Sequence, residues 1–587
     1  MVSRFDDYWK IDYRELERDI IENNRCLPKI LEERARKIGD RPYLQFEEGP
    51  MYTYAEVNKW ANRIANALLS LGLEPNTSVG WAQPSTNVSV FMTNSAEHVF
   101  IWFGILKAGL TESPLNFDLS GDPLKYQINK VESKVLFVSD EEPRPGTTPL
   151  TQRISEIIDD LPNVKYIIVL SEKGDARINT GSRSDVEVIL WEDFIKGVSD
   201  KNPDVEVKVT MPSRIIFTSG TTGLPKGVVK THAGDYLTAF GYINALQLTE
   251  NDVLFTAFPL YHSNAQVLCV YPAMVLGTRV HIYKRVSVSK YWDWIRRTGA
   301  TATNTLGPLP YWLLNLPPSE KDRDHNLRIM LQSPAPHEPE KFEEFQRRFG
   351  VIIVDGYGLT ETGMVTFNPI DKRKPGSCGK AAIGYEVKIV DPETDVELPP
   401  GEVGEIVVRN IIPWVMLPWY YKDPEKTLEA FRNLWFHTGD LGRMDEEGYF
   451  YFVDRLKDYI RVKGENVSSY ELEMLARKAI PEAQAIAAIG IKVGLGKAAE
   501  EEIKLIIVPK PEYKDKLDPK EIMDRLVKTL PTYMIPRYIE IMDEKEWQNY
   551  LTPATMRVQK YKLRQRGVTE KDWDRVAAGY KVPGLKK

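Results

Sequence analysis

The chain contains 587 residues with a mass of 67.2 kDa, enough for about three or four domain-sized units or one large composite domain. Hydrophobic residues make up 42% and charged residues 27%, which excludes a disordered or collagen-like chain. With 77 Lys and Arg against 83 Asp and Glu, the net charge of −6 gives no support for binding nucleic acid or an anionic membrane.

Targeting and disulfide signals are weak in this sequence. No apolar run reaches the roughly 18 residues of a membrane-spanning helix, and the first residues lack the hydrophobic core of a secretory signal. The three cysteines, Cys26, Cys269 and Cys378, lie more than a hundred residues apart, which excludes a disulfide framework and a short-spaced cysteine metal site. We therefore expect a cytoplasmic enzyme without an integral membrane segment.

Helical and β-rich segments alternate along the first three quarters of the chain. Apolar residues at helical spacing predict helices over 27–37 and 54–71. Short β-rich runs predict strands at 135–140, 166–171, 215–219, 351–356 and 405–409. Residues 171–187 and 198–209 are polar and predict loops, and 82–90 resembles an inserted loop. The alternation favours α/β layers with buried parallel strands.

The last 130 residues or so differ in texture, with denser charge and shorter β-rich runs. We expect strands at 449–455, 485–493 and 504–509, and helices at 470–480 and 519–529. This pattern predicts a small α+β domain. We place the boundary in a charged stretch, giving a large domain over 1–456 and a small one over 457–587.

The segment IIFTSGTTGLPKGVVKTH, residues 215–232, carries the strongest chemical signal. Glycines allow backbone N–H groups to approach phosphate oxygens, hydroxyls donate further bonds, and Lys226 adds a positive charge. It is not a Walker A loop, because Pro225 stands at the second required glycine and Gly227 follows the lysine. A solvated turn after a strand is the alternative interpretation.

This segment resembles the phosphate loop of the adenylate-forming superfamily, which comprises acyl-CoA synthetases, luciferases and peptide-synthetase adenylation domains. GYGLTETG at 356–363, GEVGEI at 401–406 and a long block at 435–473 resemble further family segments, in the family's order. The resemblance covers residues 25–565 or so. It implies an α/β fold with a large N-terminal domain of layered α/β subdomains and a small, mobile α+β C-terminal domain.

The resemblance implies roles for individual residues. One set would bind the β and γ phosphates of ATP: Thr218, Ser219, Gly220, Thr221, Thr222, Gly223 and Lys226. Tyr357 would stack on adenine, beside the turn that contains Ser333 and Ala335. Thr360 would contact the α phosphate and Glu361 would bind Mg²⁺. Asp440, assisted by Arg455, would accept hydrogen bonds from the ribose hydroxyls, although a simple turn is the alternative for Asp440.

The implied reaction joins a carboxylic acid to coenzyme A in two steps, through an acyl-adenylate and with release of pyrophosphate and then AMP. The small domain would rotate between the steps about a hinge at Lys457, and Lys463 and Gly464 would line the approach of the thiol. The alternative for both lysines is a solvated charged loop.

One departure from the family concerns its C-terminal Thr-Gly-Lys segment, whose lysine enters the adenylation site. The matching stretch, 552–564, has Met556 at the glycine and Arg557 at the lysine. Arg557 keeps the charge and can bind carboxylate and phosphate bidentately. The Thr-Met-Arg-Val sequence resembles the branch of carnitine- and crotonobetaine-CoA ligases. Lys560 is a second candidate, although it stands out of register.

Substrate signals are limited to segments that match the acyl pocket of relatives. They make His262, Gln266, Asn304 and Gly307 candidate substrate-binding residues, with a structural histidine as the alternative for His262. Their polarity favours a short- to medium-chain or functionalised acid of the hydroxy or betaine type. Two other functions stay open, an adenylating enzyme that loads a carrier protein and a non-catalytic nucleotide-binding regulator. A homodimer is compatible with the sequence.

Overall fold

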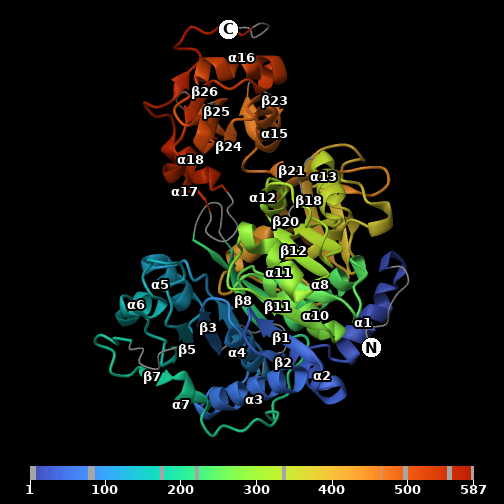
Figure 1. Ribbon diagram of the computed structural model, residues 1–587, viewed down its shortest axis with the longest axis vertical. Coiled ribbons are helices and arrows are strands. Elements are labelled where there is room, and N and C mark those ends of the chain that lie inside the picture. Colours follow the sequence, from blue (N-terminus) through green and yellow to red (C-terminus); the bar gives the residue numbers. More distant parts are fainter. Residues whose placement is uncertain are drawn as a thin grey trace. The chain divides into compact units, whose positions relative to one another are not determined.

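The computed structural model describes residues 8–76, 86–171, 178–218, 224–333, 339–462, 465–493, 500–551 and 558–582 (Figure 1). The chain divides into two compact units. The first contains Met1–Val387, Val408–Phe436 and Gly448–Phe450, and the second contains Lys388–Val407, His437–Glu447 and Tyr451–Lys587. The boundary expected before Lys457 falls inside the second unit and stays a prediction.

A seven-stranded sheet of the first unit carries the end of the predicted phosphate loop. Its order is β7 (Glu187–Leu190), β6 (Tyr166–Leu170), β5 (Val135–Ser139), β3 (Asn87–Phe91), β4 (Thr111–Pro114), β8 (Pro212–Thr218) and β9 (Lys226–Thr231). Neighbouring strands are parallel except β8 and β9. The expected strands at 135–140, 166–171 and 215–219 are confirmed. The inserted loop expected at 82–90 is wrong for its second half, because Asn87–Phe91 forms a fully buried central strand.

A nine-stranded sheet forms the other half of the first unit. Its order is β16 (Lys380–Ala381), β15 (Gly363–Phe367), β14 (Ile352–Leu359), β13 (Ile329–Ser333), β12 (Ala302–Leu306), β10 (Val253–Thr256), β11 (Arg279–Ile282), β1 (Pro42–Phe46) and β2 (Met51–Thr53). The run from β14 to β1 is parallel, and antiparallel strands close both edges. The strand expected at 351–356 is confirmed as β14.

Two buried helices contact both sheets. Helix α4 (Ala96–Lys107) is buried except at Glu97 and contacts β4 and β1. Helix α8 (His232–Ala245) is buried except at Asn244 and contacts β9 and β15. Apolar residues around the whole circumference suit helices with no solvent face. The sheet–helix–sheet arrangement confirms the layered α/β architecture.

Local sequence explains where the helix that packs against α4 begins. Helix α3 (Tyr54–Ser70), expected at 54–71, starts with a capping box in which Thr53 and Glu56 each accept the other's backbone N–H. A Cβ at Gly104 would lie 2.6 Å from the Ile64 side chain, so this close helix contact requires glycine.

The remaining helices of the first unit lie around these layers. They are α1 (Tyr13–Glu22), α2 (Leu27–Ile38), α5 (Gly121–Lys130), α6 (Leu150–Ser155), α7 (Trp191–Ile195), α9 (Ser263–Ala265), α10 (Tyr271–Leu276), α11 (Tyr291–Thr298), α12 (Leu309–Leu314), α13 (Pro339–Phe349) and α14 (Pro424–Ala430). Short 3₁₀ turns are η1 (Tyr8–Lys10), η2 (Ile158–Asp160), η4 (Val288–Lys290) and η5 (Ile370–Lys372), and η3 (Gln266–Val270) is a π-helix. Helix α2 confirms the helix expected at 27–37.

A third sheet has the order β17 (Tyr385–Val390), β18 (Gly404–Asn410), β20 (Trp435–Met444) and β19 (Phe431–Arg432), with β21 (Phe450–Arg455) paired to β20. It confirms the strands expected at 405–409 and 449–455.

The C-terminal part of the second unit is a small α+β domain, as expected. It contains the pair β22 (Ile460–Val462) and β23 (Glu465–Val467) and a sheet ordered β24 (Ala483–Val493), β25 (Glu500–Pro509), β26 (Tyr538–Ile541) and β27 (Trp573–Asp574). Its helices and turns are α15 (Ser469–Ala479), α16 (Pro519–Thr529), α17 (Glu544–Gln548), α18 (Lys560–Arg566), η6 (Pro511–Tyr513) and η7 (Thr532–Met534). Leu472, Leu505 and Leu526 join its apolar core.

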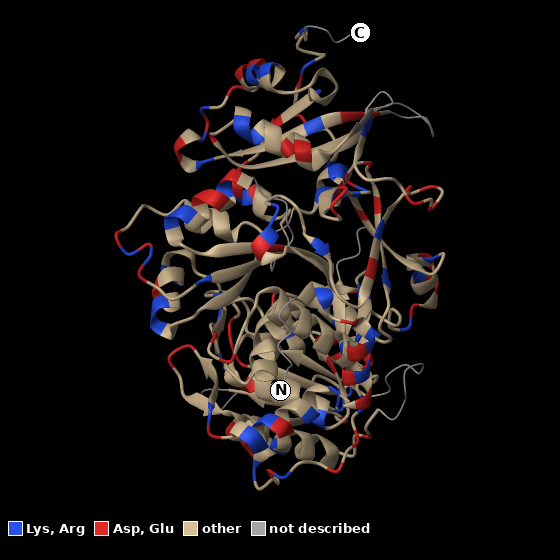
Figure 2. Cartoon of the chain, turned by 90° about the vertical axis from the view of Figure 1, so that its right-hand side faces the viewer, with Lys and Arg blue, Asp and Glu red and all other residues tan. Residues whose placement is uncertain are grey.

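Charged residues of both signs are interspersed along helices and loops (Figure 2). In the described ranges, no helix is both long and apolar enough to cross a bilayer.

Candidate active site

The predicted residues of the first unit gather where parallel strands end. His262 and Gln266 follow β10, and Asn304 and Gly307 lie in and just after β12. Ser333 is the last residue of β13, and Tyr357, Thr360 and Glu361 follow the parallel part of β14. Because the carboxyl ends of parallel strands share one edge, this sheet edge is the expected place for a ligand.

Thr218 and Lys226 are paired across the β8–β9 hairpin, at the two ends of the predicted phosphate loop. The Thr218 hydroxyl is buried and has no hydrogen-bond partner among the described residues. A buried hydroxyl without a partner is costly, and a ligand oxygen would satisfy it. The residues between them, 219–223, lie outside the described part.

Glu361 and Lys226 meet at the side chain of Tyr420. The Tyr420 hydroxyl donates a 3.1 Å hydrogen bond to Glu361 Oε1, and Lys226 Nζ lies 4.0 Å from the centroid of the Tyr420 ring. Burial lowers the pKa of Lys226, while the negative charge of Glu361 opposes that shift. The predicted metal ligand and the predicted phosphate-loop lysine thus share one partner.

Thr360 is anchored from the side of β9. Lys230 Nζ donates a 2.9 Å hydrogen bond to the Thr360 carbonyl oxygen. The Lys230 side chain is almost completely buried, and burial lowers its pKa to about 8. One lysine of β9 therefore contacts this turn directly, and another, Lys226, is linked to it through Tyr420.

Gln266 is completely buried in a polar network. Its Oε1 accepts a hydrogen bond from Arg214 Nη1, and its Nε2 donates to Glu112 at 3.1 Å. Arg214 also forms a buried ion pair with Asp235 on α8, and the Arg214 Nε–Asp235 Oδ2 distance is 3.1 Å. Burial raises the pKa of Glu112 to about 8 and lowers that of His232 to about 4.

The other candidate pocket residues are held by neighbouring backbone groups. Asn304 Nδ2 donates to the carbonyl oxygen of Asn264 at 2.9 Å, while Asn304 Oδ1 is buried without a described partner. Gly307 adopts φ of 57°, and its carbonyl accepts from Gln332 Nε2 at 3.0 Å. His262 is half-buried and occupies the N-cap position of the short helix α9, without a capping hydrogen bond from its side chain.

The second unit brings together the two predicted ribose-binding residues. Asp440 is buried, and its Oδ1 lies 3.8 Å from Arg455 Nε. Thr438 Oγ1 accepts a hydrogen bond from the Asp440 backbone N–H at 3.1 Å, which fixes the start of this turn. Lys457 is exposed in the turn between β21 and β22, a position that suits both a hinge and a solvated loop.

Several predicted residues lie outside the described part of the chain: Ser219, Gly220, Thr221, Thr222, Gly223, Ala335, Lys463, Gly464 and Arg557. Lys560, the second candidate for the adenylation lysine, is described. Its Nζ contacts Ser469 Oγ at 2.6 Å and Glu473 Oε1 at 2.7 Å, which commits it to α15 of its own unit.

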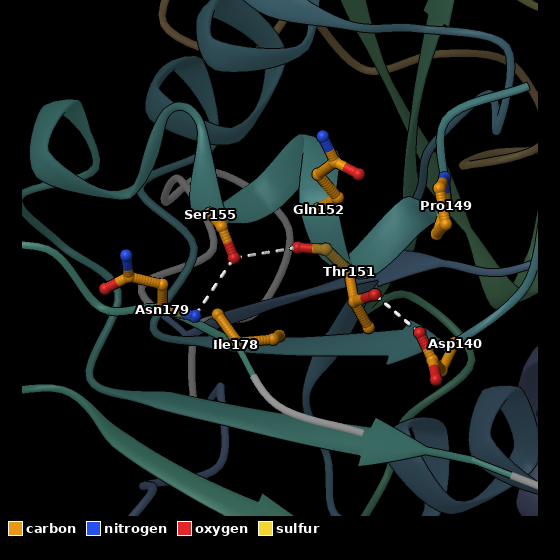
Figure 3. A pocket seen from close by; sticks show the side chains of 7 residues that line it. All are labelled: Asp140, Pro149, Thr151, Gln152, Ser155, Ile178 and Asn179. Carbon is orange, nitrogen blue, oxygen red and sulfur yellow. Dashed lines mark hydrogen bonds between the residues drawn. The ribbon is translucent and has the colours of Figure 1, made fainter. Parts of the chain in front are cut away.

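A surface hollow beside β5 and α6 is separate from these residues (Figure 3). It is lined by Asp140, Pro149, Thr151, Gln152, Ser155, Ile178 and Asn179. Thr151 donates a hydrogen bond to Asp140, and Ser155 bridges Thr151 and Asn179. No predicted site residue is among the residues that line it.

Comparison with known proteins decides the family. The model of the family described as AMP-binding enzyme matches residues 31–420. This chain belongs to the AMP-binding enzyme family. A crotonobetaine/carnitine–CoA ligase of Salmonella enteritidis PT4 (strain P125109) is 32% identical over 524 residues, covering 88% of this chain and 95% of the relative.

Solved structures of family members share the fold. The anthranilate CoA ligase AuaEII in complex with anthranoyl-AMP has a TM-score of 0.77 at 25% identity, covering 94% of this chain and 98% of that one. ATP-bound MatB from Rhodopseudomonas palustris has a TM-score of 0.76 at 26% identity, covering 92% and 98%. The expected fold class, recognition as a family member and assignment as an enzyme of this class are confirmed.

The described residues suit a site that binds Mg²⁺ together with ATP rather than Mg²⁺ alone. They contain no group of three His, Cys, Asp or Glu side chains placed to hold a metal alone. Mg²⁺ commonly binds through one or two carboxylates and substrate phosphates. A single carboxylate, that of Glu361, would be enough to hold Mg²⁺ in this way.

Three contributors to the site were missed from the sequence: Tyr420, Lys230 and Arg214. For Lys230 a signal exists, because the period of two along β9 places it on the same face as Lys226.

Proposed function

We propose that this enzyme is an acid–thiol ligase that joins a carboxylic acid to coenzyme A and cleaves ATP to AMP and pyrophosphate. The observation that carries the proposal is the meeting of Lys226, Glu361 and Tyr420 beside Thr218. A cation, a carboxylate that suits Mg²⁺ and an unsatisfied hydroxyl are the groups that a magnesium-bound triphosphate needs. Family membership and CoA-ligase relatives support the same reaction.

In the first step, a carboxylate oxygen of the acid attacks the α phosphorus, and the bond to the pyrophosphate oxygen breaks. Thr218 and Lys226 would hold the β and γ phosphates, and Thr360 would contact the α phosphate. Glu361 would hold Mg²⁺, which neutralises phosphate charge when bound. Tyr357 would face adenine beside Ser333. Catalysis then consists of positioning and charge stabilisation rather than covalent chemistry on the protein.

In the second step, the CoA thiolate attacks the acyl carbon and AMP leaves with the electrons of the broken carbon–oxygen bond. Asp440 would bind the ribose hydroxyls with help from Arg455. We propose that the small domain turns about Lys457 between the steps. Lys463 and Gly464 would then line the thiol approach, whereas Arg557 would serve the first step.

The acid is proposed to be short- to medium-chain or functionalised, of the hydroxy or betaine type. Support comes from the polar groups near the candidate pocket, Gln266 and Asn304, and from a relative named for crotonobetaine and carnitine. His262 and Gly307 would complete the lining.

The test is carboxylate-dependent exchange of labelled pyrophosphate into ATP over a panel of acids, followed by AMP release with and without CoA. We expect exchange with at least one functionalised acid and CoA-dependent AMP release. Two rival functions have distinct signatures. Transfer of the acyl group to the phosphopantetheine thiol of a carrier protein, with no CoA-dependent AMP release, would support the carrier-loading alternative. ATP binding with no exchange for any acid would support the regulator.

A further inference from the structure

Two cations face each other across the β8–β9 hairpin. Arg214 on β8 and Lys230 on β9 are cross-strand partners, and each is almost fully buried, with 0% and 3% exposure. Like charges directly opposite one another destabilise a strand pair, and burial increases the cost. Each cation therefore needs its own compensation.

Arg214 has that compensation within the described chain. Its guanidinium is ion-paired with Asp235 and donates to Gln266. Asp235 Oδ2 also accepts a 2.7 Å hydrogen bond from Ser213 Oγ. Asp235 therefore takes its hydrogen bonds from β8, and within the described ranges none comes from Lys230.

Lys230 has much less compensation for its buried charge. In the described ranges, the Thr360 carbonyl oxygen is the one acceptor of its ammonium group, and no carboxylate lies within ion-pairing distance. Lys107, an equally buried lysine on α4, offers a contrast. Its Nζ contacts Glu32 at 2.6 Å, Asn58 at 2.9 Å and Asn202 at 3.1 Å. An ammonium has three donors, so Lys107 is satisfied where Lys230 is not.

The position of Lys230 indicates which group could satisfy the remaining donors of its ammonium group. Its one acceptor is the carbonyl of Thr360, next to Glu361 in the turn after β14. Lys226, on the same face of β9, contacts the ring of Tyr420, whose hydroxyl donates to Glu361. Lys230 thus contacts the turn directly and Lys226 is linked to it through Tyr420, and a bound polyphosphate would bring negative charge to this place.

We propose that Lys230 is a positioning residue of the nucleotide site, which holds the Thr360–Glu361 turn in the geometry that binds MgATP. This inference rests on the proposed function, because it assigns the phosphates and Mg²⁺ to that turn. It adds to the nucleotide site a residue that acts indirectly, through its hydrogen bond to the Thr360 backbone carbonyl. Loss of the Lys230 hydrogen bond would leave the turn free to shift. Ordering the turn would then reduce the net free energy of MgATP binding.

The experiment is calorimetric titration of the full-length protein with MgATP in the absence of acid. Lys230→Met keeps the length of the side chain and removes the hydrogen bond and charge. We expect the dissociation constant to rise about ten-fold, equivalent to one strong hydrogen bond to a charged group. Lys107→Met is the matched control. It should lower the unfolding temperature and the fraction of active sites while the dissociation constant stays within two-fold of wild type.

A purely structural role for Lys230 would reduce the number of binding sites without changing the affinity of those that remain. Wild-type affinity in folded Lys230→Met therefore overturns the inference. Should Lys230→Met not fold, Lys230→Leu, which also removes the donor to the carbonyl, is measured in the same way, and wild-type affinity there overturns it equally. Wild-type protein that binds no MgATP would instead refute the proposed function, before any variant is compared.

Discussion

The Tyr420 hydroxyl donates a hydrogen bond to the carboxylate of Glu361, 59 residues earlier in the chain. Glu361 is the residue expected to hold Mg²⁺, and the Tyr420 ring also lies under Lys226 Nζ. One phenol side chain thus contacts both the proposed metal ligand and the proposed phosphate-loop lysine. Partners of this kind, behind a metal ligand, commonly tune metal affinity.

Tyr420→Phe keeps the ring beneath Lys226 and removes the hydrogen bond to Glu361. We expect the Mg²⁺ concentration that half-saturates pyrophosphate–ATP exchange to rise about five-fold, equivalent to about 1 kcal/mol for the lost bond. A titration of exchange against Mg²⁺ at fixed ATP measures this.

The neighbouring Tyr421 supplies a control, because its hydroxyl accepts a 3.1 Å hydrogen bond from Asn87 Nδ2 instead. Tyr421→Phe should lower the unfolding temperature and leave the Mg²⁺ requirement unchanged. An equal rise in both variants would show that Tyr420 acts through general packing.

The identity of the adenylation cation is a second prediction. Arg557→Ala should lower pyrophosphate exchange by about 100-fold, the usual effect of losing one transition-state charge contact. Conversion of supplied acyl-adenylate and CoA to acyl-CoA should change by less than about three-fold, because Arg557 serves only the first step. Equal losses in the two half-reactions would contradict this role.

The variant Lys560→Met tests whether Lys560, rather than Arg557, is the adenylation cation. The Lys560–Glu473 pair is mostly buried in the second unit, with side-chain exposures of 11% and 16%. Breaking it leaves Glu473 unpaired, and we expect a loss of about 3 kcal/mol in the free energy of unfolding. Both half-reactions should then fall together with the folded fraction. Selective loss of adenylation would instead make Lys560 the catalytic cation.

The sequence allowed the fold to be predicted well wherever one periodicity dominated, as in α3 and β5. It failed at β3. Asn87 and Ser89 make that segment polar, which is typical of a loop, yet both side chains are buried in the strand. Asn87 Nδ2 donates to the Val131 carbonyl at 2.7 Å, so the fold satisfies the polar group through a residue 44 positions away. Local patterns cannot reveal such a partner.

The same reason limited prediction of the site. Glu361 and Lys226 stand in segments whose composition indicates their chemistry. Lys230 lies in the same segment as Lys226, but its hydrogen bond to Thr360, 130 residues away, is not visible there. Tyr420 stands outside any such segment and acquires its role from Glu361, 59 residues away. The Lys230 contact comes from the packing of β9 against the turn after β14, and the Tyr420 contact comes from a separate segment of the chain. No local pattern encodes either contact.

Buried histidine makes the first unit sensitive to acid. His98 on α4 is completely buried, its Nδ1 contacts the Thr93 carbonyl oxygen at 3.1 Å, and burial lowers its pKa from 6.5 to about 4. Between these values the unfolded chain binds a proton that the folded chain does not, so stability is lost as pH falls from about 6.5 to 4. The full loss is about 3 kcal/mol.

His98→Phe removes the titrating group and keeps a ring of similar size. Urea unfolding at pH 7 and pH 5 should show a smaller acid-induced loss of stability in this variant than in wild type. The variant is expected to be less stable than wild type at pH 7, because the bond to Thr93 is gone. An unchanged difference between the two pH values would mean that His98 does not contribute to acid sensitivity.

The buried network around Gln266 predicts an effect on acid selectivity. Arg214 and Glu112 fix the two ends of the Gln266 amide, so its orientation is set by β8 and β4 rather than by the substrate. Gln266→Met keeps the volume and removes both bonds. We expect the KM for the acid to rise about ten-fold, with the KM for MgATP within two-fold of wild type. Gln127→Met, at a buried position on α5, should leave both constants unchanged. A parallel rise in both constants would show that Gln266 supports the site as a whole rather than the acyl pocket.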